Sequence, residues 1–219
     1  MNLVTLAFSG GIDSTAALLK LFNEYEFNKI TAHHVKLTTR EGVDRAEAEV
    51  RACHRIHKWF RERGMRFDYT ESEYNCLFDA RSGTPDIVRI VPIVTSALLH
   101  HAEVNGWVNM TGKGYDQLCL AYGDHADEFA LVDFRARWNL TVSLFRDIMF
   151  SATELWEFIP SYRLIVPNLN STKKDNYEYL PDDLRALTTS CRKGRNCGNC
   201  KTCLEIYAAR GEDDTEYIE

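Results

Sequence analysis

Two groups of residues have the types and the spacing that chemistry needs: a glycine turn near the start and four cysteines near the end. The turn covers residues 9–15, Ser-Gly-Gly-Ile-Asp-Ser-Thr, between a short apolar run at 3–8 and a helical pattern at 14–25. Glycines let a backbone turn tightly and approach a ligand, and the free amides at the start of a helix attract an anion. This arrangement predicts a phosphate-binding loop.

The side chains of the turn suggest roles around that phosphate. Ser9, Ser14 and Thr15 add hydroxyl donors, whereas Asp13 either helps to hold a magnesium ion or orders the loop. The alternative is an ordinary turn in which Asp13 or Ser14 caps the helix. The strand before the turn and the helix after it favour nucleotide binding. The loop is not of the Walker type, because it lacks a Gly-Lys-Ser or Gly-Lys-Thr ending.

The four cysteines, Cys191, Cys197, Cys200 and Cys203, lie within thirteen residues. Their number and spacing suit a tetrahedral zinc ion bound by four thiolates, and an iron-sulfur cluster is the chemical alternative. Four protein thiolates leave no open coordination position for a water, so we expect the metal to be structural. The solitary cysteines, Cys53 among them, are typical of small buried apolar groups.

The elements that must position these groups are predicted from apolar periodicity. Strands are expected at 3–8, 29–35, 65–70 and 107–110. Helices are expected at 14–25, 41–63, 88–105 with Pro92 in its first turn, and parts of 139–156. Residues 74–86 are expected to form a loop, and residues 173–183 an exposed polar connection. The alternation of strands and helices predicts the α/β class, with a parallel sheet flanked by helices.

Length and composition bound the remaining possibilities. The 219 residues fit one domain, 1–219, which includes a zinc-binding segment with the four cysteines at 188–207. The net charge of −6 argues against a surface built mainly for nonspecific binding of phosphate backbones, although a local basic patch stays open. No signal peptide and no apolar run of membrane length is found, so a cytoplasmic protein without a membrane partner is expected. A homodimer is compatible with the sequence, which does not define the oligomeric state.

The turn and the cysteines together resemble the 7-cyano-7-deazaguanine synthase family of PP-loop ATP pyrophosphatases, over nearly the whole chain. Residues 9–14 match its Ser-Gly-Gly-x-Asp-Ser signature, and residues 197–203 match its late Cys-Gly-x-Cys-x-x-Cys. Weaker likenesses lie at Ile90-Val91-Pro92, at Thr111-Gly112 and at residues 122–129, a divergent Tyr-Pro-Asp-Cys-Arg-x-Glu-Phe. Residues 151–155 resemble the family's Ser-Lys-x-Glu-Ile helix start without its lysine.

This resemblance implies a Rossmann-like fold of the adenine nucleotide alpha-hydrolase type with a C-terminal zinc knuckle. It implies ATP-dependent synthesis of 7-cyano-7-deazaguanine from 7-carboxy-7-deazaguanine and ammonia, through an adenylated intermediate, with structural zinc and Mg-ATP as cofactors. The implied ATP-binding residues are Phe8, Ser9, Gly10, Gly11, Ile12, Asp13, Ser14, Thr15, His33 and Gly112, of which Ser9, Asp13 and Ser14 are the catalytic candidates. The substrate candidates are Arg89, Asp116, Tyr122, Asp124 and Glu128.

Departures from the family pattern keep other functions open. The Pro, Cys and Arg of the segment at 122–129 are missing, and Ile93-Val94 replaces an Arg-Asn pair. Lys113, Arg146 or Lys173 could replace the missing phosphate-binding lysine. One alternative is a related enzyme that adenylates a deazapurine or another carboxylate for a different acceptor.

Two further alternatives remain, the first an enzyme of the same loop class and the second a protein of a different functional class. A tRNA-modifying thiolase ranks lower, because the chain is acidic and its solitary cysteines lie in no motif, so nucleic acid is not expected as a direct substrate. A noncatalytic nucleotide-binding or nucleic-acid-binding subunit is the last alternative.

Overall fold

The protein contains a parallel sheet of five strands. The computed structural model describes residues 3–38, 43–75, 90–97, 116–119, 139–140, 142–148, 163–191, 193–194 and 197–211. The strands are β1 (Leu3–Ala7), β2 (Lys29–Thr38), β3 (Asp68–Asn75), β4 (Asp116–Cys119) and β5 (Arg163–Ile165). They lie in the order β3-β2-β1-β4-β5, and every neighbouring pair is parallel. The predicted α/β class is confirmed.

The order of the strands changes direction at β1. The chain first moves outward from β1 to β2 and β3, and later returns to the other side of β1 for β4 and β5. Ligands of open parallel sheets bind outside the carboxyl ends of the strands at such a switch point. Because β1 ends at Ala7, the glycine turn that follows it lies at this point.

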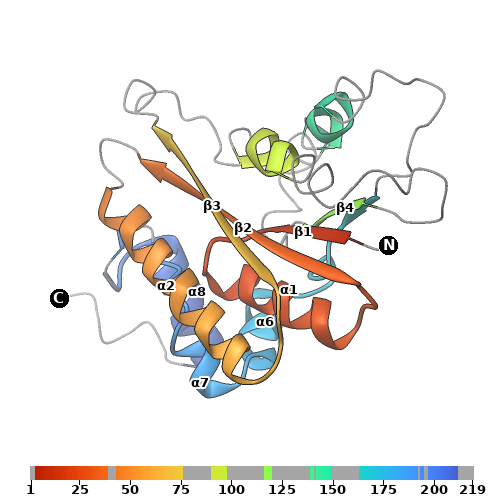
Figure 1. The fold of residues 1–219 in the computed structure, drawn as a ribbon. Helices are drawn as coiled ribbons and strands as arrows, with labels where there is room; N and C mark the ends of the chain where they lie inside the picture. Colours follow the sequence, from red (N-terminus) through yellow and green to blue (C-terminus); the bar gives the residue numbers. More distant parts are fainter. Residues whose placement is uncertain are drawn as a thin grey trace, which may run out of the picture.

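The helices that carry labels in Figure 1 cover one face of the sheet. They are α1 (Ile12–Asn23), α2 (Val43–Glu62), α6 (Lys173–Tyr179), α7 (Asp182–Arg185) and α8 (Lys201–Arg210). Two other helical segments, at 90–97 and 142–148, lie on the opposite side of the sheet (Figure 1). Helices therefore flank both faces, as the doubly wound topology requires.

The main core fills the space between the sheet and the labelled helices. Val4 and Leu6 of β1 are fully buried, and α1 packs Leu18 and Leu21 into the same cluster. Phe60 of α2 is also fully buried and contacts the ring of Phe67 edge-on, with ring centroids 5.7 Å apart. This core fixes the position of β1 and α1, between which the glycine turn lies.

The C-terminal third differs from the sequence-based expectation. Residues 173–183 do not form an exposed connection, because they contain α6 and the start of α7. Thr172 and Asp175 form a capping box that begins α6, and the side chains of Asn176, Leu180 and Leu184 are buried. The short strands β4 and β5 and the helix α8 were not predicted. The expected strand at 107–110 lies outside the described residues.

Within the described residues, no helix combines the length and the apolar character needed to span a membrane.

Candidate active site

Gly10 is required by the course of the backbone and by the closeness of α2. Its φ of +70° lies in the left-handed region, which favours glycine. A Cβ atom at this position would lie 3.0 Å from Sγ of Cys53 and 3.1 Å from the Ala52 side chain, both on α2. The turn is thus held against α2 where no side chain could be accommodated.

Unpartnered backbone amides mark the start of α1. Gly11 is the N-cap and has no side chain to cap the helix. The amide of Ile12 donates to Oγ of Ser190 at 3.1 Å, and no acceptor in the described part of the chain serves the amides of Asp13 and Ser14. Together with the helix dipole, such amides form a binding site for an anion.

The hydroxyl groups of the turn differ in what they offer a ligand. Thr15 is fully buried and donates to the carbonyl of Gly11 at 2.8 Å, so its hydroxyl stabilises the turn from within. Ser14 is also buried and donates to the same carbonyl at 3.2 Å. Ser9 is exposed, and its Oγ lies 3.1 Å from Oγ of Ser14. Ser9 is therefore the hydroxyl of the turn that is most open to a bound phosphate.

Asp13 is bound by groups from the C-terminal third. One carboxylate oxygen pairs with Nζ of Lys173, and the other accepts from Nδ2 of Asn176 at 3.0 Å. Nδ2 of Asn168 donates to the backbone carbonyl of Asp13 at 2.8 Å. Because both carboxylate oxygens are used, this arrangement favours the role of ordering the loop over that of binding magnesium.

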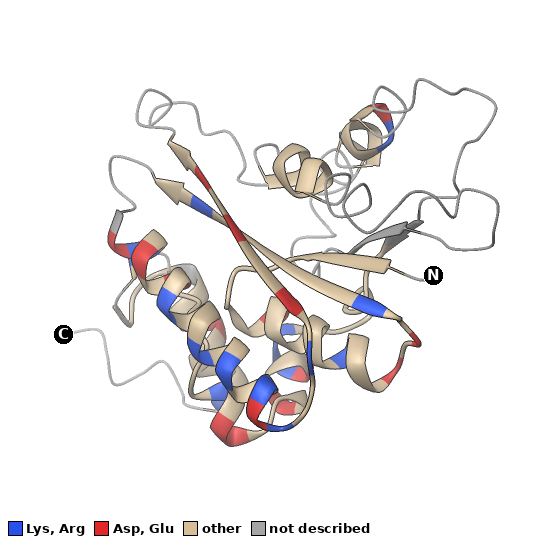
Figure 2. Cartoon of the chain, in the orientation of Figure 1, with Lys and Arg blue, Asp and Glu red and all other residues tan. Residues whose placement is uncertain are grey.

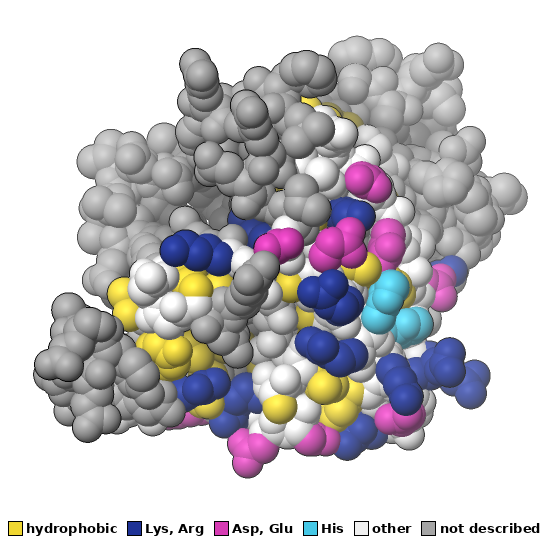
Figure 3. All heavy atoms as spheres, turned by 90° about the vertical axis from the view of Figure 1, so that its left-hand side faces the viewer, with side chains coloured by type: hydrophobic (Ala, Val, Ile, Leu, Met, Phe, Trp, Pro, Cys, Tyr) yellow, Lys and Arg dark blue, Asp and Glu magenta, His cyan; other side chains and the backbone are white. Residues whose placement is uncertain are grey.

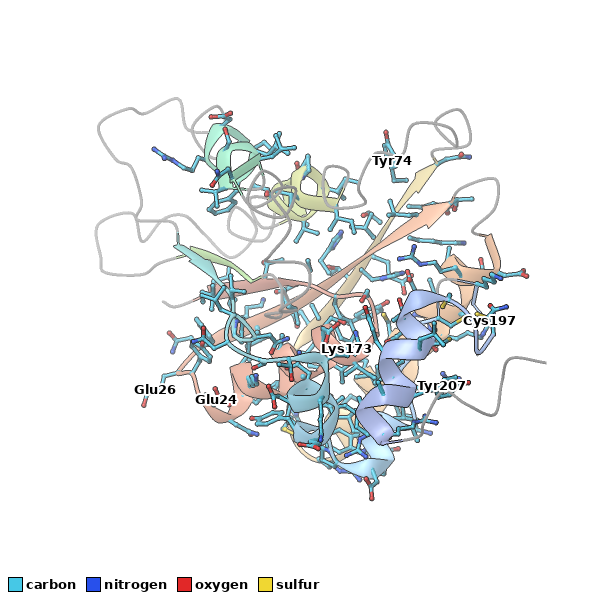
Figure 4. The ribbon with its side chains drawn as sticks, turned by 180° about the vertical axis from the view of Figure 1, so that it is seen from behind. Glu24, Glu26, Tyr74, Lys173, Cys197 and Tyr207 are labelled. Carbon is cyan, nitrogen blue, oxygen red and sulfur yellow. The ribbon has the colours of Figure 1, made fainter. Side chains whose placement is uncertain are left out.

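Lys173 brings a positive charge to the loop. Its side chain is 12% exposed, and it lies at the start of α6, near the centre of the view in Figure 4. A lysine in this position can hold Asp13 and also approach an anion at the amides of α1. Of the three lysine and arginine candidates, Lys113 lies outside the described residues and Arg146 is exposed on the helical segment at 142–148.

The segment just before the first cysteine of the cluster closes the other side of the turn. The amide of Thr189 donates to the carbonyl of Gly10 at 2.8 Å, and Ser190 binds the amide of Ile12. A Cβ on Gly11 would lie 3.1 Å from Oγ of Ser190. Cys191 follows directly, so the cysteine cluster is tied to the loop through two residues.

The four predicted cysteines come together. Their sulfur atoms all lie within 4.8 Å of one another, and Sγ of Cys197 is 4.0 Å from Sγ of Cys203. Around one zinc ion with Zn–S bonds of about 2.3 Å, the corners of a tetrahedron lie about 3.8 Å apart. In a four-iron cluster each thiolate binds a different iron, which spreads the sulfurs further. The observed spacing fits a single ion.

The pKa values of two of these thiols are shifted in opposite directions. A hydrogen bond from the backbone of Asn199 lowers the pKa of Cys197. Burial, together with the neighbouring thiols, raises the pKa of Cys203 to about 12. Four thiolates this close repel one another, and a bound metal cation removes that repulsion. The cluster can therefore hold a metal ion.

A cavity of about 140 Å³ lies beside α8. Its lining comes mostly from α8 and from residues 185–190, and it includes the guanidinium groups of Arg185 and Arg210 and the ring of Tyr207. The glycine loop contributes Ile12 to this lining, and the cysteine cluster contributes Cys203. Figure 4 shows Tyr207 and Cys197 along the same side of the molecule, on and beside α8.

The other predicted site residues are placed as follows. The side chain of Phe8 is buried in the core, and both ring nitrogens of His33 bond to hydroxyls of β3, Thr70 at 2.8 Å and Ser72 at 2.9 Å. Asp116 begins β4 opposite Leu3, at the end of the sheet away from the turn. The remaining candidates lie outside the described residues; these are Arg89, Gly112, Tyr122, Asp124 and Glu128.

Three residues that hold the loop were not singled out from the sequence, namely Asn168, Asn176 and Ser190. The sequence does contain a pattern close to Asn168 and Asn176. Residues 172–175, Thr-Lys-Lys-Asp, match the family's helix start of hydroxyl, lysine, any residue and acid, and they include the lysine that residues 151–155 lack. Residues 151–155 lie outside the described residues.

The strand order and the loop between β1 and α1 define an open α/β fold with a parallel sheet that winds outward from β1 in both directions. A solved structure with a similar fold is that of the U34-tRNA thiolase NcsA from Methanococcus maripaludis with its [4Fe-4S] cluster. The two share 14% identity with a TM-score of 0.51, over all of this chain and 75% of that one. At this identity the likeness shows the fold alone. No family model and no curated protein matches the sequence.

Proposed function

We propose that this protein is an ATP pyrophosphatase that transfers AMP to a carboxylate substrate. The observation that carries the proposal is the loop itself, in which the amides of Asp13 and Ser14 at the start of α1 have no acceptor in the described part of the chain, and the Asp13 side chain is paired with Lys173. These groups suit the pyrophosphate that leaves when ATP is cleaved between its α and β phosphates. Magnesium supplies further charge neutralisation when it is bound with ATP.

The reaction that the sequence motifs support best is the synthesis of 7-cyano-7-deazaguanine. The carboxylate of 7-carboxy-7-deazaguanine attacks the α phosphate of ATP, which releases pyrophosphate and leaves an acyl adenylate. Ammonia then displaces AMP and loses a proton, giving the amide. A second ATP activates the amide oxygen with release of pyrophosphate, and that oxygen leaves with AMP as the nitrile forms. The protein's part is to position the reactants and to balance phosphate charge.

The cysteine cluster is proposed to hold structural zinc. The sulfur spacing fits one tetrahedral ion, and four thiolates leave no position at which a substrate could bind the metal. The ion would hold Cys191 in place, and through it the residues Thr189 and Ser190 that contact the loop. A cytoplasmic enzyme of a single domain, 1–219, with small-molecule substrates and no membrane partner, remains our proposal.

A second candidate is a related enzyme with a different acceptor. The structural neighbour is a tRNA thiolase with a [4Fe-4S] cluster, so an adenylating enzyme that acts on another nucleophile is compatible with this fold. The sulfur spacing in this chain disfavours a four-iron cluster, and the described lone cysteine, Cys53, is fully buried. Both observations rank synthesis of the nitrile above sulfur transfer.

One experiment separates these functions. Purified protein is given Mg-ATP, with and without 7-carboxy-7-deazaguanine and ammonium, and AMP, pyrophosphate and nitrile are measured. We expect AMP and pyrophosphate in equal amounts, two of each per nitrile. AMP that depends on the deazapurine but yields no nitrile would indicate a different acceptor. Absence of AMP under every condition would contradict an enzymatic function.

A further inference from the structure

Positive charge is concentrated in one segment of this acidic protein. Residues 51–66, which comprise the second half of α2 and the turn after it, contain six basic side chains and one acidic one. The segment therefore carries a net charge of +5, whereas the whole chain carries −6. The basic residues are Arg51, Arg55, Lys58, Arg61, Arg63 and Arg66.

Most of these cations are exposed and lack acidic partners. Arg51, Arg61 and Arg66 are exposed, and no carboxylate in the described part of the chain pairs with them. Arg55 donates only to the carbonyl of Leu187, at 3.3 Å. Figure 3 shows Lys and Arg side chains running down this side of the molecule next to the histidines. The charge is thus available to a partner in solution.

The cations form a stripe along one face of the helix. Arg51, Arg55, Lys58 and Arg61 follow at spacings of four, three and three residues, which keeps them on one side of α2. The stripe extends over about 15 Å of helix axis, since the rise is about 1.5 Å per residue. Figure 2 shows the same basic bands along the cartoon of α2. A regular line of negative charges of similar length would match it.

One histidine of α2 lies in the field of the stripe. Burial lowers the pKa of His57, and the positive charges of Arg61 and His54 lower it further. His54 is the member of this neighbourhood that has an acidic partner from the sheet, Glu71 of β3, at 2.7 Å. The stripe thus has acidic neighbours, Glu71 beside His54 and Glu62 beside Lys58, whereas its three arginines form no ion pair in the described part of the chain.

We propose that this stripe binds the phosphate backbone of a double-stranded nucleic acid. Guanidinium groups bind phosphate through two parallel hydrogen bonds, and five of the six cations are arginines. No large hydrophobic side chain is exposed in the segment 51–66, which disfavours insertion into a membrane and an apolar protein interface. Trp59 is buried, so the described segment offers no stacking platform for unpaired bases.

The test compares two double variants with the same loss of charge. Arg51→Gln/Arg61→Gln removes two members of the stripe, and Lys174→Gln/Arg210→Gln removes two exposed cations on α6 and α8. Binding of labelled 20-base-pair RNA and DNA duplexes is measured by fluorescence anisotropy from about 50 to about 200 mM salt. We expect the first variant to bind about tenfold more weakly at the lowest salt. Its slope of log K against log salt should fall by about 1.8, since each phosphate contact contributes about 0.9. The second variant should change affinity less than about twofold.

Three results would overturn the proposal. They are equal weakening in both variants, tighter binding of a single strand than of the duplexes, and binding of phosphatidylserine vesicles with the same dependence on Arg51 and Arg61. Thermal unfolding of both variants controls for folding. Release of AMP should be unchanged in the Arg51→Gln/Arg61→Gln variant, so failure of this proposal is distinct from failure of the proposed enzyme.

Discussion

At the scale of single residues, the loop depends on groups far along the chain. Asp13 is held by Asn168 and Asn176, which lie 155 and 163 positions later. Asn176 and Lys173 bind the carboxylate, Asn168 binds the backbone carbonyl, and the amides of α1 stay open to a ligand. Substitutions around the loop should therefore separate its folding role from its binding role.

Gly10→Ala should impair both stability and nucleotide binding. The left-handed backbone costs a non-glycine residue about 1–2 kcal/mol, and the new Cβ would press on Cys53. Gly64→Ala is the matched control, because Gly64 has φ +77° and no atom within 4 Å of a Cβ placed there. We expect Gly10→Ala to lower the free energy of unfolding in urea by more than Gly64→Ala does. Only Gly10→Ala should weaken ATP binding, and equal effects on both measurements would contradict the close contact with α2.

Lys173→Met should weaken ATP binding by about tenfold or more. It removes a cation beside the anion site and leaves the Asp13 carboxylate without its ion pair, so both changes disfavour bound phosphate. Lys174→Met is the control, since Lys174 is exposed and pairs only weakly with Glu178 at 3.8 Å. Isothermal titration with Mg-ATP would measure both variants. An unchanged affinity in Lys173→Met would show that Lys173 only supports the fold.

At the scale of elements, α2 and α7 are joined by one carboxylate. Asp183 accepts from Nε1 of Trp59 at 2.7 Å and from Arg63 at 2.6 Å, while the Arg63 guanidinium lies 3.9 Å above the Trp59 ring. The hydrogen bond from Trp59, with help from Arg63, lowers the pKa of Asp183 below its usual 3.8. This contact ties the C-terminal third to the part of the chain that carries the sheet.

The contribution of Asp183 should depend on pH in a defined direction. A carboxyl with a lowered pKa in the folded state stabilises the protein above its unfolded pKa, and loses that contribution as pH falls through the folded pKa. Asp183→Asn should therefore lower the melting temperature at neutral pH, with the difference from the wild type shrinking below about pH 3.8. Thermal unfolding followed by circular dichroism from neutral pH down to about pH 3 measures this. A difference that grows as the pH falls would contradict the ion pair.

The elements that could be predicted are those with strong apolar periodicity. The alternation from β1 to β3 was visible because Val4 and Leu6, and later the buried stripe of α2, repeat at the spacing of a strand and a helix. The helix α6 was missed because its sequence, Lys-Lys-Asp-Asn-Tyr-Glu-Tyr, is polar on most sides and is held by its capping box and by Asn176. The strands β4 and β5, of four and three residues, are too short to show a period.

The candidate site was predictable to a similar extent. The turn and the four cysteines could be predicted because each group lies within a short stretch of sequence. Residues that bind one ligand from a short stretch keep a recognisable spacing. The sequence does not reveal the roles of Asn168, Asn176 and Ser190. Each of them contacts the loop only in the folded chain, and no local sequence pattern surrounds them. The basic stripe was not predicted for a different reason. The net charge of −6 is a sum over the whole chain and does not show that one helix face is basic.

At the scale of the whole molecule, the cysteine cluster and the proposed nucleotide-binding loop should respond together. Removal of the metal with a chelator, or Cys197→Ser, should free the segment that ends at Ser190 and so weaken ATP binding as well as lower the melting temperature. We expect elemental analysis to find one zinc per chain before chelation. Added zinc should restore the chelated wild type more fully than the Cys197→Ser variant. Full ATP affinity in the metal-free protein would contradict the connection between the two sites.

The contacts around Gly10, Ile12 and Asp13 also set an order of events during synthesis. The groups that hold the turn, from Asn168 to Ser190, leave the ribosome at least 155 residues after it. A nascent chain can therefore form β1, α1 and α2 well before the loop is held in place, since domains emerge from their N-terminal side. Under the proposed function, affinity for ATP would require that residues 168–190 have docked, and ribosome-bound chains that stop before Asn168 should lack it.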